Sequence, residues 1–279
     1  MITDQLKRLS KAKLVLRGAV CGDILGSWYE FRSTKSLDCN LFVPYSRFTD
    51  DTICSIAVAD ALINGCDFTK SLQRWCLKYP SAGYGGRFSR WFRQENPEPY
   101  DSWGNGSAMR VSSVGAFAIS VDEVMDLAAQ SAEVSHNHPE GIKGAQATAL
   151  AIYLALNGAS KEEIKAEIEQ RFDYDLSRNY FDIQSTYFFE VSCQTSVPEA
   201  IISFLVSDSY ESAIRHAVAL GGDADTQAAI AGGIAAAYYG EIPESILSFC
   251  EERLPDDMKL VINEFDSELD KRYGESVLL

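Results

Sequence analysis

Apolar residues recur three and four positions apart along most of the chain, a period typical of helices that bury one face. Runs that alternate apolar and polar residues, as half-buried strands do, are few. The helical period predicts ten helices: 12–29, 52–64, 69–78, 121–135, 139–156, 161–170, 197–206, 209–219, 226–239 and 243–252. Three long stretches lack the period, and loops of that length usually carry function: 32–48, 79–109 and 172–196. We therefore expect an all-α protein, one domain over residues 1–279, with its chemistry on loops.

The composition is ordinary for a soluble globular protein, with 279 residues, 46% hydrophobic and 23% charged. The net charge of −15 argues against nucleic acid, because phosphate backbones are bound by clustered Lys and Arg. Almost half of this excess lies in residues 241–279, which we interpret as a solvated acidic face. Seven cysteines without a CxxC spacing, a charged N-terminus and no apolar run of membrane length predict a cytoplasmic protein without a membrane partner. We expect a monomer.

Two acidic clusters carry the strongest chemical signal. They are Thr49-Asp50-Asp51-Thr52, the first acidic cluster, and Asp223-Ala224-Asp225-Thr226, the second acidic cluster. Each precedes an apolar helical run, and Asp or Thr at such a place often caps a helix. One helix start needs only one capping side chain, however, and both clusters exceed that need. If folding brings the four carboxylates together, they must bind protons or cations, and oxygen ligands suit hard divalent ions. The sequence therefore predicts a two-metal site.

The first long helical run contains three glycines, Gly18, Gly22 and Gly26, spaced four apart on one face. Small residues at this spacing let a second helix approach closely. Glu30 follows the same run. Taken alone it is an ordinary surface carboxylate, since most glutamates are exposed. Its position at the end of this run also allows a catalytic role.

Two glycine-rich loops and a pair of histidines are further candidates for ligand binding. Residues 102–110, with the sequence SWGNGSAMR, present backbone amides suited to an anion, or they simply turn a corner. Residues 79–88 offer aromatic faces for a base, or form an ordinary loop. His136 and His138 are phosphate or ribose donors, or a helix cap before Pro139. With three histidines and no cysteine pairing, a zinc site is not expected.

Five motifs together resemble those of the ADP-ribosylglycohydrolase family, in order and in spacing. They are Gly22-Asp23-Ile24-Leu25-Gly26, the first acidic cluster, Gly104-Asn105-Gly106-Ser107-Ala108-Met109-Arg110, Ser135-His136, and Gly221-Gly222 with the second acidic cluster. The resemblance extends from about residue 16 to residue 239. It implies an all-α domain with two divalent cations, Mg²⁺ or Mn²⁺, that hold ADP-ribose.

The resemblance also implies roles for individual residues. The implied metal ligands are Thr49, Asp50, Asp51, Asp223, Asp225 and Thr226. The implied substrate-binding residues are Ser102, Trp103, Gly104, Asn105, Gly106 and His136. Glu30 corresponds to a glutamate near the metals and the scissile ribose, so Glu30, Asp223 and Asp225 are the candidates for the base that activates water.

The implied reaction is hydrolysis at the anomeric carbon of the distal ribose, which releases ADP-ribose from a modified protein side chain. The resemblance does not extend to the acceptor, because the loop 32–48, expected to shape its access, matches nothing in the family pattern. Two alternatives remain. The protein binds ADP-ribose without catalysis, as a sensor or immunity protein, or it hydrolyses adducts of nucleic acids or small metabolites.

Overall fold

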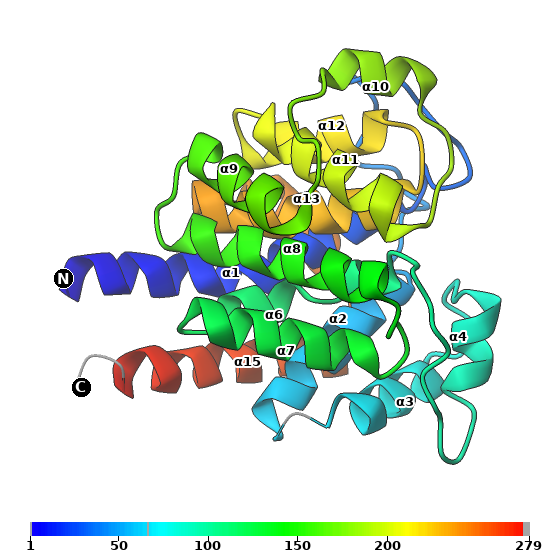
Figure 1. The fold of residues 1–279 in the computed structure, drawn as a ribbon, viewed down its shortest axis with the longest axis vertical. Helices are drawn as coiled ribbons and strands as arrows, with labels where there is room; N and C mark the ends of the chain where they lie inside the picture. Colours follow the sequence, from blue (N-terminus) through cyan, green and yellow to red (C-terminus); the bar gives the residue numbers. More distant parts are fainter. Residues whose placement is uncertain (1, 66, 276–279) are drawn as a thin grey trace.

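The computed structural model describes residues 2–65 and 67–275, which form fifteen helices and no strand (Figure 1). The expected all-α fold is confirmed. None of the helices in these ranges has the length and apolar character needed to cross a membrane. The helices are α1 (Ile2–Gly26), α2 (Asp50–Ile63), α3 (Phe68–Lys78), α4 (Gly86–Trp91), α5 (Gly106–Met109), α6 (Ser112–Phe117), α7 (Val121–Glu133), α8 (Pro139–Leu156), α9 (Lys161–Phe172), α10 (Tyr180–Thr186), α11 (Cys193–Leu205), α12 (Tyr210–Ala219), α13 (Ala224–Tyr239), α14 (Glu244–Glu251) and α15 (Asp256–Glu275).

Each of the ten helices predicted from the period corresponds to a helix of the structure. Most ends differ by a few residues, but α1 begins ten residues before the predicted start. Local capping explains several boundaries. Ser160 and Glu163 form a reciprocal capping box at the start of α9, and Gly240 ends α13 with a φ of 72°, which glycine adopts readily.

Five helices are not predicted by the period: α4, α5, α6, α10 and α15. The first four have only four to seven residues, too few for a period to show. Helix α15 is longer, and its many acidic residues obscure an apolar stripe. Met258, Ile262, Phe265 and Leu269, spaced four and three apart, are buried on its inner face. The acidic stretch therefore has a buried face as well as a solvated one.

Helices α1 and α13 form the tightly packed centre of the fold, and the packing role of the three glycines is confirmed. A Cβ on Gly22 would lie 2.1 Å from the carbonyl oxygen of Ala228, and one on Gly26 would lie 2.5 Å from that of Ala224. Larger side chains would therefore separate the helices. The numbering runs in opposite directions along this contact, so the helices are antiparallel. The end of α1 consequently meets the start of α13, next to the second acidic cluster.

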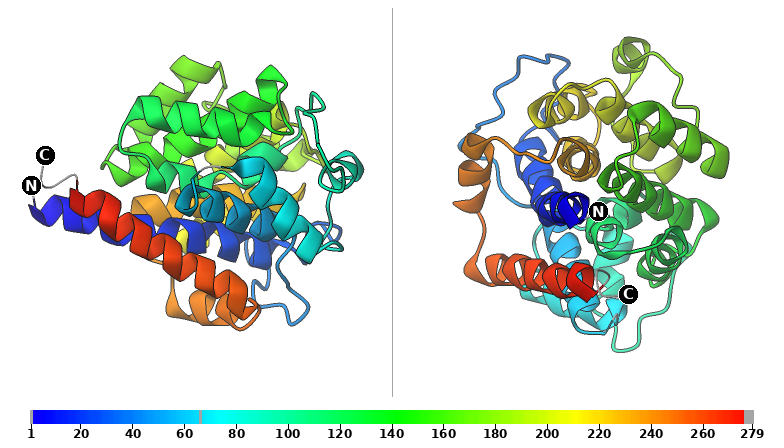
Figure 2. Two further views of the ribbon diagram at one scale, coloured as in Figure 1. Left: turned by 90° about the horizontal axis from the view of Figure 1, so that it is seen from below. Right: turned by 90° about the vertical axis from the view of Figure 1, so that its left-hand side faces the viewer.

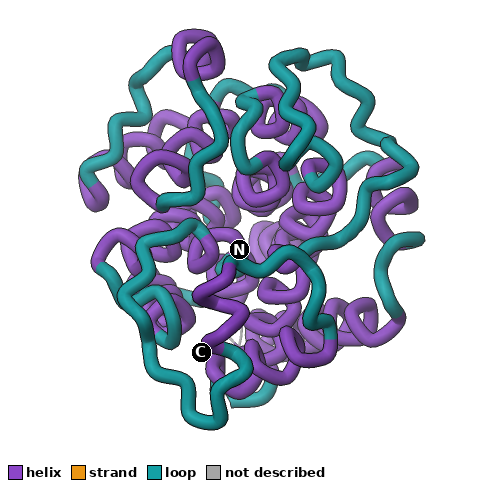
Figure 3. The backbone as a smooth tube through the Cα atoms, turned by 90° about the vertical axis from the view of Figure 1, so that its right-hand side faces the viewer, coloured by secondary structure: helices purple, strands orange, loops and turns teal. Residues whose placement is uncertain are grey.

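Helix α15 lies along α1 (Figure 2). Ion pairs join them, from Lys13 to Asp270 at 2.7 Å and from Arg17 to Asp266 at 2.8 Å. Loops gather across one face of the molecule, shown in teal in Figure 3. Several of these loops line a cavity of about 470 Å³.

Candidate active site

Asp23 of α1 holds the start of α2 from the side. Its carboxylate accepts hydrogen bonds from the backbone N and Oγ1 of Thr49, at 2.9 and 2.7 Å, and from the same two groups of Thr52. Asp23 is fully buried; burial raises its pKa, and these hydrogen bonds oppose the shift. The first acidic cluster is thus fixed against α1. The sequence analysis assigns Asp23 no role. The feature that could have indicated one is its position, since an ionisable residue stands there between glycines that pack against another helix.

The second acidic cluster begins α13 and faces the end of α1. Asp223 occupies the N-cap position of α13, but its side chain makes no capping hydrogen bond; its carboxylate instead accepts a hydrogen bond from Nδ2 of Asn105 at 2.7 Å. Carboxylate oxygens of Glu30, Asp223 and Asp225 all lie within 4.8 Å of one another. The antiparallel packing of α1 and α13 therefore brings Glu30, which alone resembled a surface residue, to the cluster.

Both acidic clusters line one cavity of about 470 Å³. Its acidic part contains the carboxylates of Glu30, Asp50, Asp51, Asp223 and Asp225. Two buried oxygens, Oδ1 of Asp51 and Oδ1 of Asp225, have no hydrogen-bond partner among the described residues. Buried acceptors are normally paired, so these two atoms are available to a proton or a cation.

The two threonines assigned as metal ligands lie in different places. Thr226 lines the cavity, and its Oγ1 is 3.9 Å from Sδ of Met109. Thr49 lies behind the lining, where its hydroxyl donates to Asp23. The oxygen of a hydroxyl that donates its hydrogen keeps lone pairs for a second partner, so this contact leaves the assignment of Thr49 open.

The pKa values of the cluster are raised by burial and by mutual repulsion. Burial, reinforced by the negative charges of Asp225 and Asp23, raises the pKa of Glu30 to about 8. Burial raises the pKa of Asp223 to about 6, although hydrogen bonds with Asp225 and Asn105 oppose the shift. The pKa values of the other three carboxyls are raised as well, mainly by burial. Without a counter-charge these groups retain protons, and a bound cation would reverse that preference.

A loop from the chain's middle forms the next part of the wall. Four of its predicted ligand-binding residues line the cavity: Ser102, Gly104, Asn105 and Gly106. The backbone of this loop is anchored on the chain before α11, since Asn105 N donates to Val191 O at 2.8 Å. Trp103 does not line the cavity. Its ring lies 5.5 Å from that of His138 and is 48% exposed.

The two neighbouring histidines have different roles: one caps a helix, and the other faces the cavity. His138 is the N-cap of α8, and its Nδ1 accepts a hydrogen bond from Glu140 N at 3.1 Å. His136 is buried and lines the cavity. Burial, aided by the positive charges of Arg110 and Arg87, keeps the pKa of His136 well below its usual value, so its ring is neutral.

The remaining wall is aromatic and cationic, and only its residues from loop 79–88 are among the sequence-based candidates. Arg87, Phe88, Tyr100 and Arg110 all line the cavity. The guanidinium of Arg87 lies 4.8 Å from the ring centre of Tyr100, and that of Arg110 lies 5.7 Å from Phe88. Part of this wall, including Phe88, comes from the second glycine-rich loop. The cavity therefore combines an acidic part with a part that suits an anion and a flat ring.

Comparison with known proteins identifies the family. A family model described as ADP-ribosylglycohydrolase matches residues 4–275. The chain belongs to the ADP-ribosylglycohydrolase family. It is thus a member of a family of hydrolytic enzymes, as its motifs predicted.

Two relatives support this placement, and a solved structure shares the fold. ADP-ribosylhydrolase ARH3 of Homo sapiens is 28% identical, over 88% of this chain and 90% of that protein. ADP-ribosylarginine hydrolase Tri1 of Pseudomonas putida (strain GB-1) is 27% identical, over 83% of this chain and 71% of that protein. A structure titled "ADP-ribosylglycohydrolase-related protein complex" shares the fold, with a TM-score of 0.72, 24% identity, and coverage of 94% of this chain and 99% of that one.

Proposed function

We propose that this ADP-ribosylglycohydrolase cleaves the bond between ADP-ribose and a protein side chain, in a reaction that depends on divalent cations. One observation carries the proposal: two acidic clusters from distant parts of the chain meet in a cavity whose other wall is cationic and aromatic. ADP-ribose has matching parts. Its ribose hydroxyls suit the acidic part, its diphosphate suits the arginines, and its adenine suits the aromatic rings.

The donor set fits hard divalent cations. Every candidate ligand offers oxygen, and two buried carboxylate oxygens, on Asp51 and Asp225, lack a partner among the described residues. The residues that would hold two ions, Mg²⁺ or Mn²⁺, are Thr49, Asp50, Asp51, Asp223, Asp225 and Thr226. Such ions would lower the pKa of a bound water and polarise the ribose oxygens.

The chain's own residues then position the substrate and move a proton. Asn105 holds Asp223 through the hydrogen bond at 2.7 Å, which keeps that carboxylate turned into the cavity. Glu30 is half-buried beside Asp225 and is the carboxylate of this group that lies outside both clusters. We assign Glu30 the proton transfer between the attacking water and the reacting centre, with Asp223 and Asp225 as the alternatives.

A protein acceptor is favoured over a nucleic acid by the charge of −15. The name of Tri1 specifies an arginine adduct on its own substrate, and an arginine adduct is accordingly the first substrate to test.

The test is hydrolysis of a substrate panel by the full chain in Mg²⁺ or Mn²⁺. Peptides ADP-ribosylated on arginine or serine are compared with an ADP-ribosylated nucleobase, and released ADP-ribose is quantified. Turnover of a peptide substrate supports the proposal and identifies the linkage. Turnover of the nucleobase adduct alone contradicts the protein acceptor. Binding of ADP-ribose without hydrolysis of any adduct would show a catalytically silent binding protein.

A further inference from the structure

Arg110 is a buried positive charge without an acidic partner. Its side chain is 1% exposed, and no carboxylate of the described residues forms an ion pair with it. Nη2 donates to the carbonyl of Ser131 at 2.6 Å and to Oγ of Ser135 at 3.0 Å, whereas Nε has no partner there. Burying an unpaired charge is costly, so a protein that keeps one beside a cavity has a use for it.

Ser135 connects this charge to the neighbouring histidine. Its fully buried hydroxyl oxygen accepts from Arg110 and lies 2.8 Å from Nδ1 of His136. A guanidinium has no acceptor, so the hydroxyl hydrogen is not used on that side. Within the described residues, the remaining partner of the hydroxyl is Nδ1. If Ser135 instead accepted from Nδ1–H, its own buried hydroxyl hydrogen would have no acceptor among the described residues, so donation to Nδ1 is favoured and makes Nδ1 the unprotonated nitrogen of the ring.

The other ring nitrogen is then a donor at the cavity. In a neutral imidazole one nitrogen is protonated, so the hydrogen is on Nε2. Nε2 lies over the glycine loop: a Cβ on Gly106 would be 3.0 Å from it, and one on Gly104 would be 3.6 Å away. It has no hydrogen-bond partner among the residues that the structure describes. An N–H group supported by a buried cation is suited to an anionic oxygen.

We propose that Arg110 and Ser135 are positioning residues, which hold His136 as an Nε2–H donor to a phosphate oxygen of ADP-ribose. The inference rests on the proposed function for the identity of the ligand. The hydrogen-bonded series Arg110–Ser135–His136 keeps the proton on Nε2 of His136 before the ligand binds, so binding requires no ring flip or tautomer exchange. It also explains why a buried arginine without a carboxylate is retained at this wall.

The tautomer is measured directly by ¹⁵N NMR of the full chain without ligand. The sequence has only three histidines, so the ring signals of His136 can be assigned with His136→Gln. We expect the wild type to show a protonated Nε2 and an unprotonated Nδ1. Ser135→Ala should lose this single tautomer, and Ser135→Thr, which keeps the hydroxyl, should retain it.

Ser131→Ala is the matched control. Ser131 is an equally buried serine near Arg110, but its hydroxyl donates to Ala128 O and only its carbonyl contacts the guanidinium. By calorimetry, Ser135→Ala should weaken ADP-ribose binding about tenfold, the effect of losing a hydrogen-bond contribution of ordinary size. Ser131→Ala and Ser135→Thr should bind within about twofold of the wild type, because they leave that hydrogen bond in place.

Two results would overturn the inference. One is a wild-type spectrum with Nδ1 protonated, which needs no variant and is decisive even if Ser135→Ala fails to fold. The other is a Ser135→Ala protein that keeps the wild-type tautomer or the wild-type affinity. A wild type that binds no ADP-ribose would instead refute the proposed function, while the ligand-free spectrum would still report the tautomer.

Discussion

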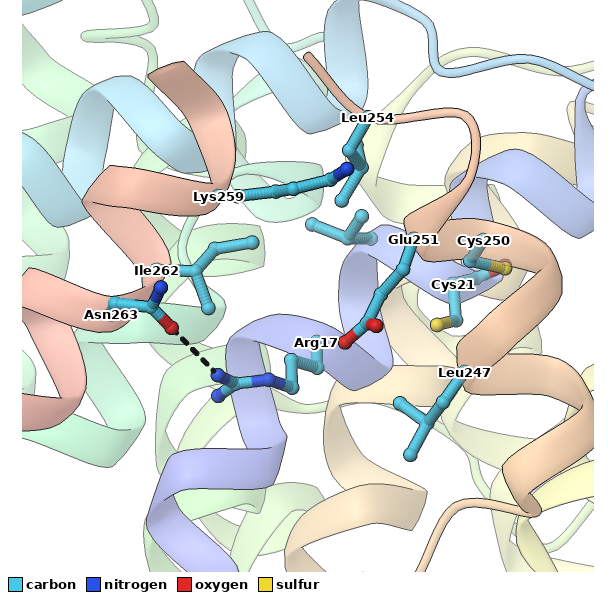
Figure 4. Close-up of a pocket in the computed structure, with 10 residues that line it drawn as sticks. Arg17, Cys21, Leu247, Cys250, Glu251, Leu254, Lys259, Ile262 and Asn263 are labelled. Carbon is cyan, nitrogen blue, oxygen red and sulfur yellow. Dashed lines mark hydrogen bonds between the residues drawn. The ribbon is translucent and has the colours of Figure 1, made fainter. Parts of the chain in front are cut away.

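Two cavities differ in how their charged side chains are paired: the candidate active site is lined by Glu30, just after helix α1, and a second cavity is lined by α1 itself. The second cavity, of about 190 Å³, lies between α1, α14 and α15 (Figure 4). Its lining includes the apolar residues Val20, Leu254 and Ile262, and two of its three charged side chains, Arg17 and Lys259, have acidic partners. Arg17 pairs with Asp266 at 2.8 Å and reaches Asn263 at 3.5 Å.

The candidate active site, in contrast, keeps uncompensated charge on both walls. Carboxylates of the two clusters crowd together, and among residues 2–65 and 67–275 two of their oxygens have no hydrogen-bond partner and Arg110 has no carboxylate partner. Folding alone would select against both features, because each costs free energy. Unsatisfied buried charge, more than cavity size or apolar lining, therefore distinguishes a functional site from a packing gap.

The largest expected effect comes from the acidic part. Asp225→Asn should reduce hydrolysis of the best panel substrate at least about 100-fold, because it removes a carboxylate whose free oxygen serves a cation or the reacting water. Its metal-free stability should be unchanged or higher, since like-charge repulsion is relieved. Asp266→Asn, at the ion pair beside the second cavity, is the control and should keep its turnover. Equal losses in both variants would contradict the distinction between the cavities.

Glu30→Gln separates chemistry from surface effects. The amide keeps the shape of the carboxylate but cannot accept a proton in the same way, so turnover should fall by roughly 10²–10⁴-fold. ADP-ribose should still bind, and the free energy of unfolding should change by less than about 0.5 kcal/mol or increase. Steady-state kinetics, calorimetry and thermal unfolding measure these quantities. Turnover within a few-fold of the wild type would transfer the proton-transfer role to Asp223 or Asp225.

Cation binding tests whether the two clusters act together. Mg²⁺ or Mn²⁺ should raise the melting temperature, with a stabilisation of about 2.7 kcal/mol at a concentration one hundred times the Kd. Asp50→Ala and Asp225→Ala, one from each cluster, should each reduce the shift. If either variant responds like the wild type, the clusters do not share a site.

The metal-free protein should lose stability as pH rises. Glu30 has a folded pKa of about 8 against an ordinary 4.5, and Asp223 one of about 6 against 3.8. A raised folded pKa gives stability that is complete below the ordinary pKa and is lost as pH rises through the folded value. Unfolding in a chelator should therefore become easier between about pH 4 and pH 8. Asp225→Asn should weaken this pH dependence. An unchanged plot of stability against pH would contradict the mutual repulsion of these carboxylates.

The smallest effect should come from the second cavity. Val20→Ile adds one methyl group to its apolar floor and should change stability by no more than about 1 kcal/mol, with turnover unaffected. A marked change in kcat or KM would show that this cavity also serves the reaction.

The sequence predicts what depends on local pattern. The helical period and the capping residues locate most helices, and the excess of Asp and Thr at two helix starts points to the acidic part. Asp23 and Arg110 could not be assigned in this way, because their importance depends on which distant groups surround them after folding. The family resemblance names Asn105 as a substrate-binding residue, but the hydrogen bond from its amide to Asp223 depends likewise on the fold. Burial and the absence of a partner are properties of the folded chain.

We propose that the acidic part of this cavity holds the cations that the reaction requires. The most direct measurement is release of ADP-ribose from the best panel substrate by chelator-treated protein, before and after addition of Mg²⁺ or Mn²⁺. We expect negligible turnover in the chelator and recovery with the cation in the wild type, but no recovery in Asp225→Asn. Full turnover in the chelator, or a cation response in Asp225→Asn equal to that of the wild type, would contradict this proposal.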